Sequence, residues 1–159
     1  AHCDKHVIKM ILEYAQMMST AHRVLDPPSE LIKPMYKLTH KNHPSAVWVR
    51  ESNANYQWTH DLWFWLCKEY WWRYDKIHKT WEKLYNKLSH TPLNIPSGSF
   101  TYPPLCMPDE YKIETGNSLN DAIESYRKYY LEDKSSFAKW GGLVENMRQQ
   151  PEWWKNANV

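Results

Sequence analysis

The sequence predicts an all-α fold, a compact single-domain helical bundle over residues 1–159 with an aromatic core and a proline-rich strap. Apolar residues recur at helical spacing in several long segments, and no segment alternates convincingly as a strand does. The 10 Trp, 11 Tyr and 3 Phe supply large rings for the core. A chain of 159 residues is long enough to bury such a core in one domain.

Prolines and capping residues set the expected helix boundaries. The first helix should cover residues 3–25 and end before Pro27 and Pro28, with a short turn of helix over 29–33. Later helices are expected over 44–50, 56–76 and 80–88, and the longest of them, 56–76, is capped by Asn53 or Asn55. A last helix is expected to start at Ser118 or Asn120 and to continue through Tyr130. That longest helix is apolar almost all round at residues 62–67, which places it centrally. Residues 91–108 contain five prolines and form the strap.

Composition narrows the class of protein. With 4 Gly and no glycine-rich motif, a phosphate-binding loop is not expected, and a net charge of +2 permits nucleic-acid binding without requiring it. Three widely spaced cysteines favour a reduced, cytoplasmic compartment. No apolar run is long enough to cross a membrane, and no signal peptide is visible. Because the chain starts inside an apparent helix without a cap, we expect that an upstream N-terminal segment is missing.

One polar stripe runs along the first expected helix. Its members recur at helical spacing and are His2, His6, Lys9, Glu13, Gln16 and Thr20, while apolar residues take most of the remaining circumference. A narrow stripe of this composition suits a cleft, where the pKa of Glu13 can be tuned for acid/base catalysis. The alternatives are a structural polar network or a simple ion pair between Lys9 and Glu13.

Three further clusters combine cations with aromatic rings. The first is His40-Lys41-Asn42-His43-Pro44 followed by Arg50, which could bind phosphate. The second is the segment from Arg73 to Lys76, which could equally serve the helix dipole. The third runs through Tyr126-Arg127-Lys128-Tyr129-Tyr130, where stacking rings and cations suit a DNA surface, although at least half of such rings are expected in the core.

Metal and cysteine chemistry are not expected. His2 and His6 share a helix face, but Cys3 points about 100° away from His2, and no second ligand pair stands at zinc spacing. No motif pairs Cys3 with a histidine for nucleophilic catalysis. We therefore expect no metal site and no other cofactor.

These motifs occur in an order that resembles a known enzyme family. Asp4-Lys5-His6, with Glu13 seven residues after the histidine, resembles the DxH motif and downstream glutamate of the phage endonuclease V type of pyrimidine-dimer DNA glycosylase. Asn42-His43-Pro44 resembles the element that opens the central helix of that family, and Arg73-Tyr74-Asp75-Lys76 the basic segment that closes it. Tyr126 to Tyr130 resembles its DNA-contacting tail. The chain also looks like uncharacterised phage proteins with HCDKHVVKM-like and NHPSAVW-like stretches.

The resemblance implies a function and a set of roles. It implies a DNA glycosylase, with or without AP-lyase activity, that acts on a damaged or modified pyrimidine in duplex DNA inside the bacterial host. Glu13 would be the catalytic acid/base with His6 beside it. The expected DNA- or phosphate-binding residues are Lys9, Arg23, His43, Arg50, Arg73, Lys76, Arg127, Lys128, Tyr129 and Tyr130.

The nucleophile is where the sequence departs from that family. The family uses a free N-terminal amine on an extended segment upstream of the DxH motif, where the low pKa of an α-amine suits it for attack on C1′. Here Ala1 begins the helix that carries Glu13, roughly 18 Å away at the rise of an α-helix. The alternatives are an amine on a missing segment, a water nucleophile, or Lys5 or Lys9. The rival functions are a non-enzymatic nucleic-acid or protein-binding module and an enzyme acting on free nucleotides or RNA.

Overall fold

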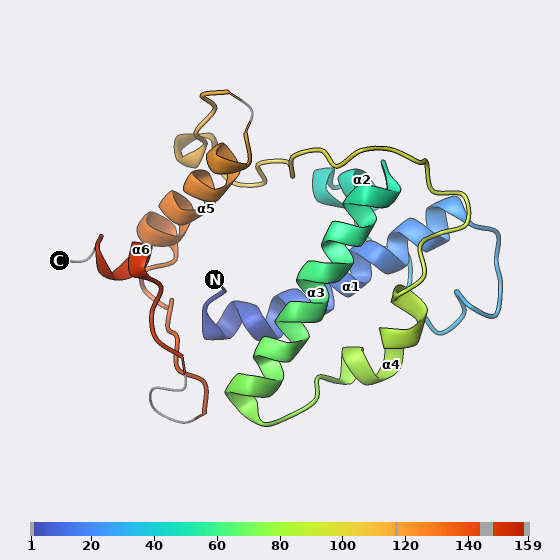
Figure 1. Cartoon of the computed structure of the whole chain (residues 1–159), viewed down its shortest axis with the longest axis horizontal. Coiled ribbons are helices and arrows are strands. Elements are labelled where there is room, and N and C mark those ends of the chain that lie inside the picture. The colour runs from blue at the N-terminus through green and yellow to red at the C-terminus, as the bar shows by residue number, and fades with distance from the viewer. Residues whose placement is uncertain (1, 117, 144–147, 158–159) are drawn as a thin grey trace.

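The computed structural model describes residues 2–116, 118–143 and 148–157, and within them the chain is helical and has no strand. The all-α prediction is confirmed. The α-helices are α1 (Asp4–Leu25), α2 (Pro44–Val49), α3 (Asn53–Tyr74), α4 (Lys79–Leu88), α5 (Leu119–Asp133) and α6 (Glu152–Lys155), with a 3-10 turn η1 at Asp109–Tyr111. In Figure 1, α1 to α4 form one bundle, α5 and α6 lie beside its N-terminal end, and the strap runs between them.

Most expected boundaries are confirmed, and the exceptions come from capping. Pro44 begins α2, and Ser118 caps α5 in a reciprocal capping box with Asp121. The expected cap of α3 was wrong, because the Ser52 hydroxyl accepts the Asn55 N–H at 3.1 Å and Asn55 lies inside the helix. Residues 29–33 form a turn, and the short helix α6 was not expected.

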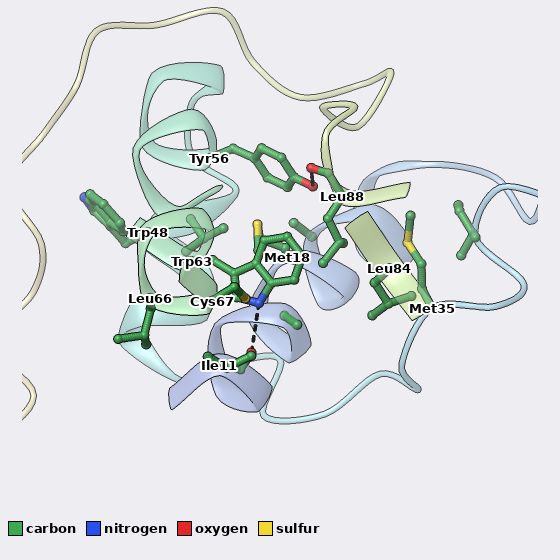
Figure 2. Close-up of a cluster of buried hydrophobic side chains, with 14 of the residues drawn as sticks. Ile11, Met18, Met35, Trp48, Tyr56, Trp63, Leu66, Cys67, Leu84 and Leu88 are labelled. Carbon is green, nitrogen blue, oxygen red and sulfur yellow. Dashed lines mark hydrogen bonds between the residues drawn. The ribbon is translucent and has the colours of Figure 1, made fainter. Parts of the chain in front are cut away.

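The main core lies between α1, α3 and α4. Trp63 is fully buried, and its Nε1–H donates to the carbonyl of Ile11 at 3.1 Å, which joins α3 to α1 (Figure 2). Tyr56 donates its hydroxyl to the carbonyl of Leu88 at 3.0 Å and so joins α3 to α4. Each of these rings removes a large apolar area from water while its polar tip stays hydrogen-bonded.

Helix α3 is central but not buried all round, contrary to the expectation. Trp65 is 68% exposed, although it lies in the apolar stretch at residues 62–67. Trp71 and Trp72 near the end of the helix are also more than half exposed. The buried face of α3 meets α1 and α2, and its Trp63 stacks on Trp81 of α4, so the tryptophans of α3 divide between core and surface.

The strap is ordered by hydrogen bonds to the start of α3. The Thr101 N–H donates to Asn55 Oδ1, and the Asn53 N–H donates to the carbonyl of Pro96, both at 2.9 Å. The Trp48 indole donates to Thr101 Oγ1 at 2.9 Å. The prediction of an ordered strap over the core is therefore confirmed.

A buried ion network fastens the C-terminal region onto the bundle. Arg73, which is 2% exposed, donates to Asp4 Oδ1 at 2.8 Å and to Glu69 Oε1 at 2.7 Å. The N–H groups of Gly141 and Gly142 donate to the same Asp4 carboxylate at 3.3 and 3.2 Å. A second apolar cluster of Cys3, Ala138, Trp140 and Trp154 lies beside this network.

No helix in the described part of the chain is both long and apolar enough to cross a membrane.

Candidate functional site

The polar stripe of α1 is covered at both ends. At the N-terminal end, His2 Nε2 lies 3.0 Å from the Tyr14 hydroxyl, and His6 Nδ1 shares a hydrogen bond with the Tyr130 hydroxyl of α5. At the other end, buried Thr20 donates to the carbonyl of Thr39 at 3.1 Å. The open part of the stripe is its middle, between His6 and Thr20.

Glu13 lies in a small pocket at this open part. The pocket has a volume of about 220 Å³ and is lined by Glu13, Gln16 and Met17 of α1, Thr39, His40 and His43 of the following loop, and Ala46 of α2. Lys9 Nζ lies 3.2 Å from Glu13 Oε1, and the Glu13 side chain is 34% exposed. The expected ion pair therefore exists, but its carboxylate also faces a pocket.

Backbone geometry holds the loop against this pocket. His40 has a left-handed φ of 45°, and its Nδ1 lies 2.8 Å from Thr39 Oγ1. A left-handed residue reverses the chain direction sharply, and histidine is among the non-glycine residues that adopt this conformation more often than others. Arg50 supports the loop from α2, since its Nη1 donates to the carbonyls of Lys41 and Ala46, both at 2.8 Å.

The hydrogen bonding of His43 fixes its tautomer when the ring is neutral. Its Nδ1 accepts the Ser45 N–H at 3.2 Å, as a cap for α2. A neutral imidazole has one donor and one acceptor nitrogen, so Nε2 carries the proton. His43 thus lines the Glu13 pocket as a hydrogen-bond donor, and the structure brings these two predicted residues together.

His6 lies outside the pocket, in the contact between α1 and α5. Its ring packs edge-on against Tyr130 and Phe137. Burial lowers the pKa of His6, and the charges of Lys134 and Lys9 lower it further against the opposing effect of Glu13. His6 is therefore held neutral between positive charges.

Two arginines expected at a DNA surface have structural roles instead. Arg23 donates to the carbonyls of Ile32, Met35 and Tyr36, and so fixes the loop after α1. Arg73 is buried in the ion network with its partners on α1 and α3, so phosphates cannot reach its guanidinium. The expectation is corrected by hydrogen bonds to backbone carbonyls for Arg23 and by burial in an ion network for Arg73. Lys76, just beyond α3, is exposed.

The aromatic-basic run of α5 is split between two sides of the helix. Arg127 pairs with Glu124 at 2.7 Å, and the Lys128 ammonium donates to a backbone carbonyl of η1. Tyr129 packs on Tyr111 with ring centroids 4.9 Å apart, whereas Tyr130 turns inward to His6. None of these four helix residues lines the Glu13 pocket.

A larger hollow of about 630 Å³ lies between the strap and the start of α5. Glu114 and Asp121 both line it, and the Asp121 carboxylate accepts hydrogen bonds from Thr115 and from the N–H groups of Gly116 and Ser118. These hydrogen bonds, led by the one from Thr115, lower the pKa of Asp121 to about 2. The hollow shares no residue with the polar stripe of α1.

Sequence reasoning placed Glu13 and His43 in separate clusters and did not assign Gln16 or His40 to the site. The sequence carries no local signal that residues 39–43 fold back against α1, because this contact joins segments that are distant along the chain. No group of three or more metal-binding side chains occurs in the described residues. Comparisons with models of protein families, with curated proteins and with solved structures found no match for this chain. The site is therefore interpreted from its own residues.

Proposed function

We propose that the protein is a DNA glycosylase that acts on a damaged or modified pyrimidine in duplex DNA, with AP-lyase activity where an amine nucleophile is supplied. The observation that carries the proposal is one small pocket that both Glu13 and His43 line, with His43 Nδ1 occupied by the Ser45 N–H. The resemblance of Asp4-Lys5-His6, Glu13 and the later motifs to the endonuclease V type of glycosylase points to the same reaction.

The residues of the pocket suit acid/base catalysis. In a water route, Glu13 accepts a proton from a water molecule that attacks C1′ of the sugar, while the bond to the base breaks and its electrons leave with the base. His43 Nε2–H can donate a proton to the departing base. Lys9 Nζ pairs with Glu13 Oε1 at 3.2 Å, and Lys9, Lys41 and Lys76 are exposed cations that can contact phosphates.

Glu13→Gln tests the role of the carboxylate, because the amide keeps its shape and loses its basicity. On a duplex with a thymine dimer or an abasic site, we expect about 10²- to 10⁴-fold slower reaction with binding retained. Glu30→Gln is the matched control, since Glu30 is 90% exposed and lies outside the pocket. Equal activity of the Glu13 variant and the control would refute the proposal. Borohydride trapping of a protein–DNA adduct separates the amine route from the water route.

A non-enzymatic binding module is the second candidate, and the tryptophans on α3 favour it. Trp65, Trp71 and Trp72 expose more than half of their surface, which is unusual unless a partner covers them. A binding module would retain its affinity for DNA in the Glu13→Gln variant without any base release by the parent protein. A steep fall of that affinity with salt would indicate contacts with phosphates.

A further inference from the structure

Gln16 is the open hydrogen-bonding group of the α1 stripe. His2, His6, Lys9 and Thr20 all have side-chain or backbone partners. Gln16 is partly buried in the pocket wall, and its carboxamide has no hydrogen-bond partner among the described residues. A carboxamide without a protein partner leaves one acceptor and two donor hydrogens available to a ligand of the pocket that Gln16 lines.

The volume of the pocket suits a single ring as its occupant. Its volume of about 220 Å³ is below the roughly 300–1,000 Å³ of sites for drug-sized ligands, so it suits one ring better than a whole nucleotide. Met17 and Ala46 supply apolar walls, and His43 offers an Nε2–H donor. Lys9, the nearest cation on the stripe, is already paired with Glu13, so an anionic group is poorly matched at this point.

We propose that Gln16 is a specificity residue, which reads the hydrogen-bonding edge of a single pyrimidine turned out of the duplex into the Glu13 pocket. This inference rests on the proposed function for the source of the base. A pyrimidine edge alternates acceptors and donors, and a carboxamide can pair with two neighbouring atoms of such an edge. Glu13 then acts on the sugar while Gln16 selects the base.

The first test compares substrates that carry a base with one that lacks it. Gln16→Met keeps the side-chain length and removes the hydrogen-bonding groups. We expect the variant to lose about 10- to 100-fold of the preference between uracil and cytosine targets, whose hydrogen-bonding edges differ, with unchanged affinity for a duplex carrying a tetrahydrofuran abasic analogue. An equal loss on all duplexes, or no loss on any, would overturn the inference. An unfolding midpoint equal to that of the parent protein excludes a folding defect.

The second test does not depend on catalysis. Free thymine or uracil is titrated into the full ¹⁵N-labelled chain, and the Gln16 side-chain amide signals are assigned by their absence from the Gln16→Met spectrum. We expect saturable shifts of these signals, and no shift would overturn the inference. The proposed function fails if Glu13→Gln retains full activity or if no duplex releases a base. If the amide shifts still occur in that case, the base-reading role of Gln16 stands. If base release needs Glu13 but the Gln16 variant keeps its preference, only the inference fails.

Discussion

Replacing Asp4 by alanine removes the carboxylate that joins α1 to α3 and to the segment after α5. Arg73 would lose its partner at 2.8 Å while remaining 2% exposed, and the Glu69 carboxylate at 2.7 Å, which also pairs with Arg148, would be left to balance it. Breaking a buried pair by removing one partner costs about 3–5 kcal/mol. Because Glu69 still neutralises the guanidinium, we expect the lower end, about 3 kcal/mol. For a domain of this size that loss lowers the melting temperature by roughly 6–12 °C.

A surface pair of the same geometry provides the control. Arg127 lies 2.7 Å from Glu124, but the two side chains are 39% and 53% exposed. We expect Glu124→Ala to change stability by no more than about 0.5 kcal/mol. Asp4→Asn, which keeps an acceptor oxygen without the charge, should lie between the two alanine variants. Thermal unfolding followed by circular dichroism measures all three. If Asp4→Ala and Glu124→Ala had equal effects, burial would not set the strength of this network.

Three further outcomes are expected. The pKa of His6 is lowered in the fold by burial and by Lys134 and Lys9, so the unfolded chain binds a proton first and stability should fall as the pH drops below about 6.5. Denaturant midpoints at pH 7.5 and 5 should show a smaller difference in His6→Gln, and an unchanged difference would count against this. Gly142→Ala should lower the free energy of unfolding by at least about 1–2 kcal/mol, because φ is +77° and the new Cβ would lie 2.5 Å from the Arg73 carbonyl oxygen. The control is Gly116→Ala, whose new Cβ meets nothing within 4 Å and which should be nearly neutral in thermal unfolding. Arg23→Met should cost about 2–3 kcal/mol in urea unfolding, since it leaves three loop carbonyls without their charged donor; a neutral result would contradict this structural role.

Local signals in the sequence were enough to predict most of the helices. Pro44 marks the start of α2, and Ser118 with Asp121 marks the start of α5, because both signals act within one turn of the chain. The cap of α3 was misplaced, since Ser52, Asn53 and Asn55 are all acceptable caps by type. Hydrogen bonding to the strap decides among them, and the strap is distant in sequence.

The division of residues between surface and interior was harder to predict. Composition cannot show that Trp63 is buried while Trp65 is exposed. The two residues differ in whether other helices pack on their side of α3, which is a property of the tertiary structure. Arg73 looked like a basic residue at a helix end, and its partner Asp4 is 69 residues away. Pairings of this kind depend on tertiary structure, and no helical spacing reports them.

The α1 stripe shows how such pairings define the site. Helical spacing correctly put its polar residues on one face, and that prediction alone allowed a structural network or a cleft. The structure contains both, because α5 covers His6 and the loop covers Thr20, while Glu13 and Gln16 between them line a pocket. A polar group with a fixed protein partner contributes to stability, and one that faces a pocket is available to a ligand. We therefore expect Asp4→Ala to lower the stability of the fold, and Glu13→Gln to lower the rate of base release while the stability stays unchanged.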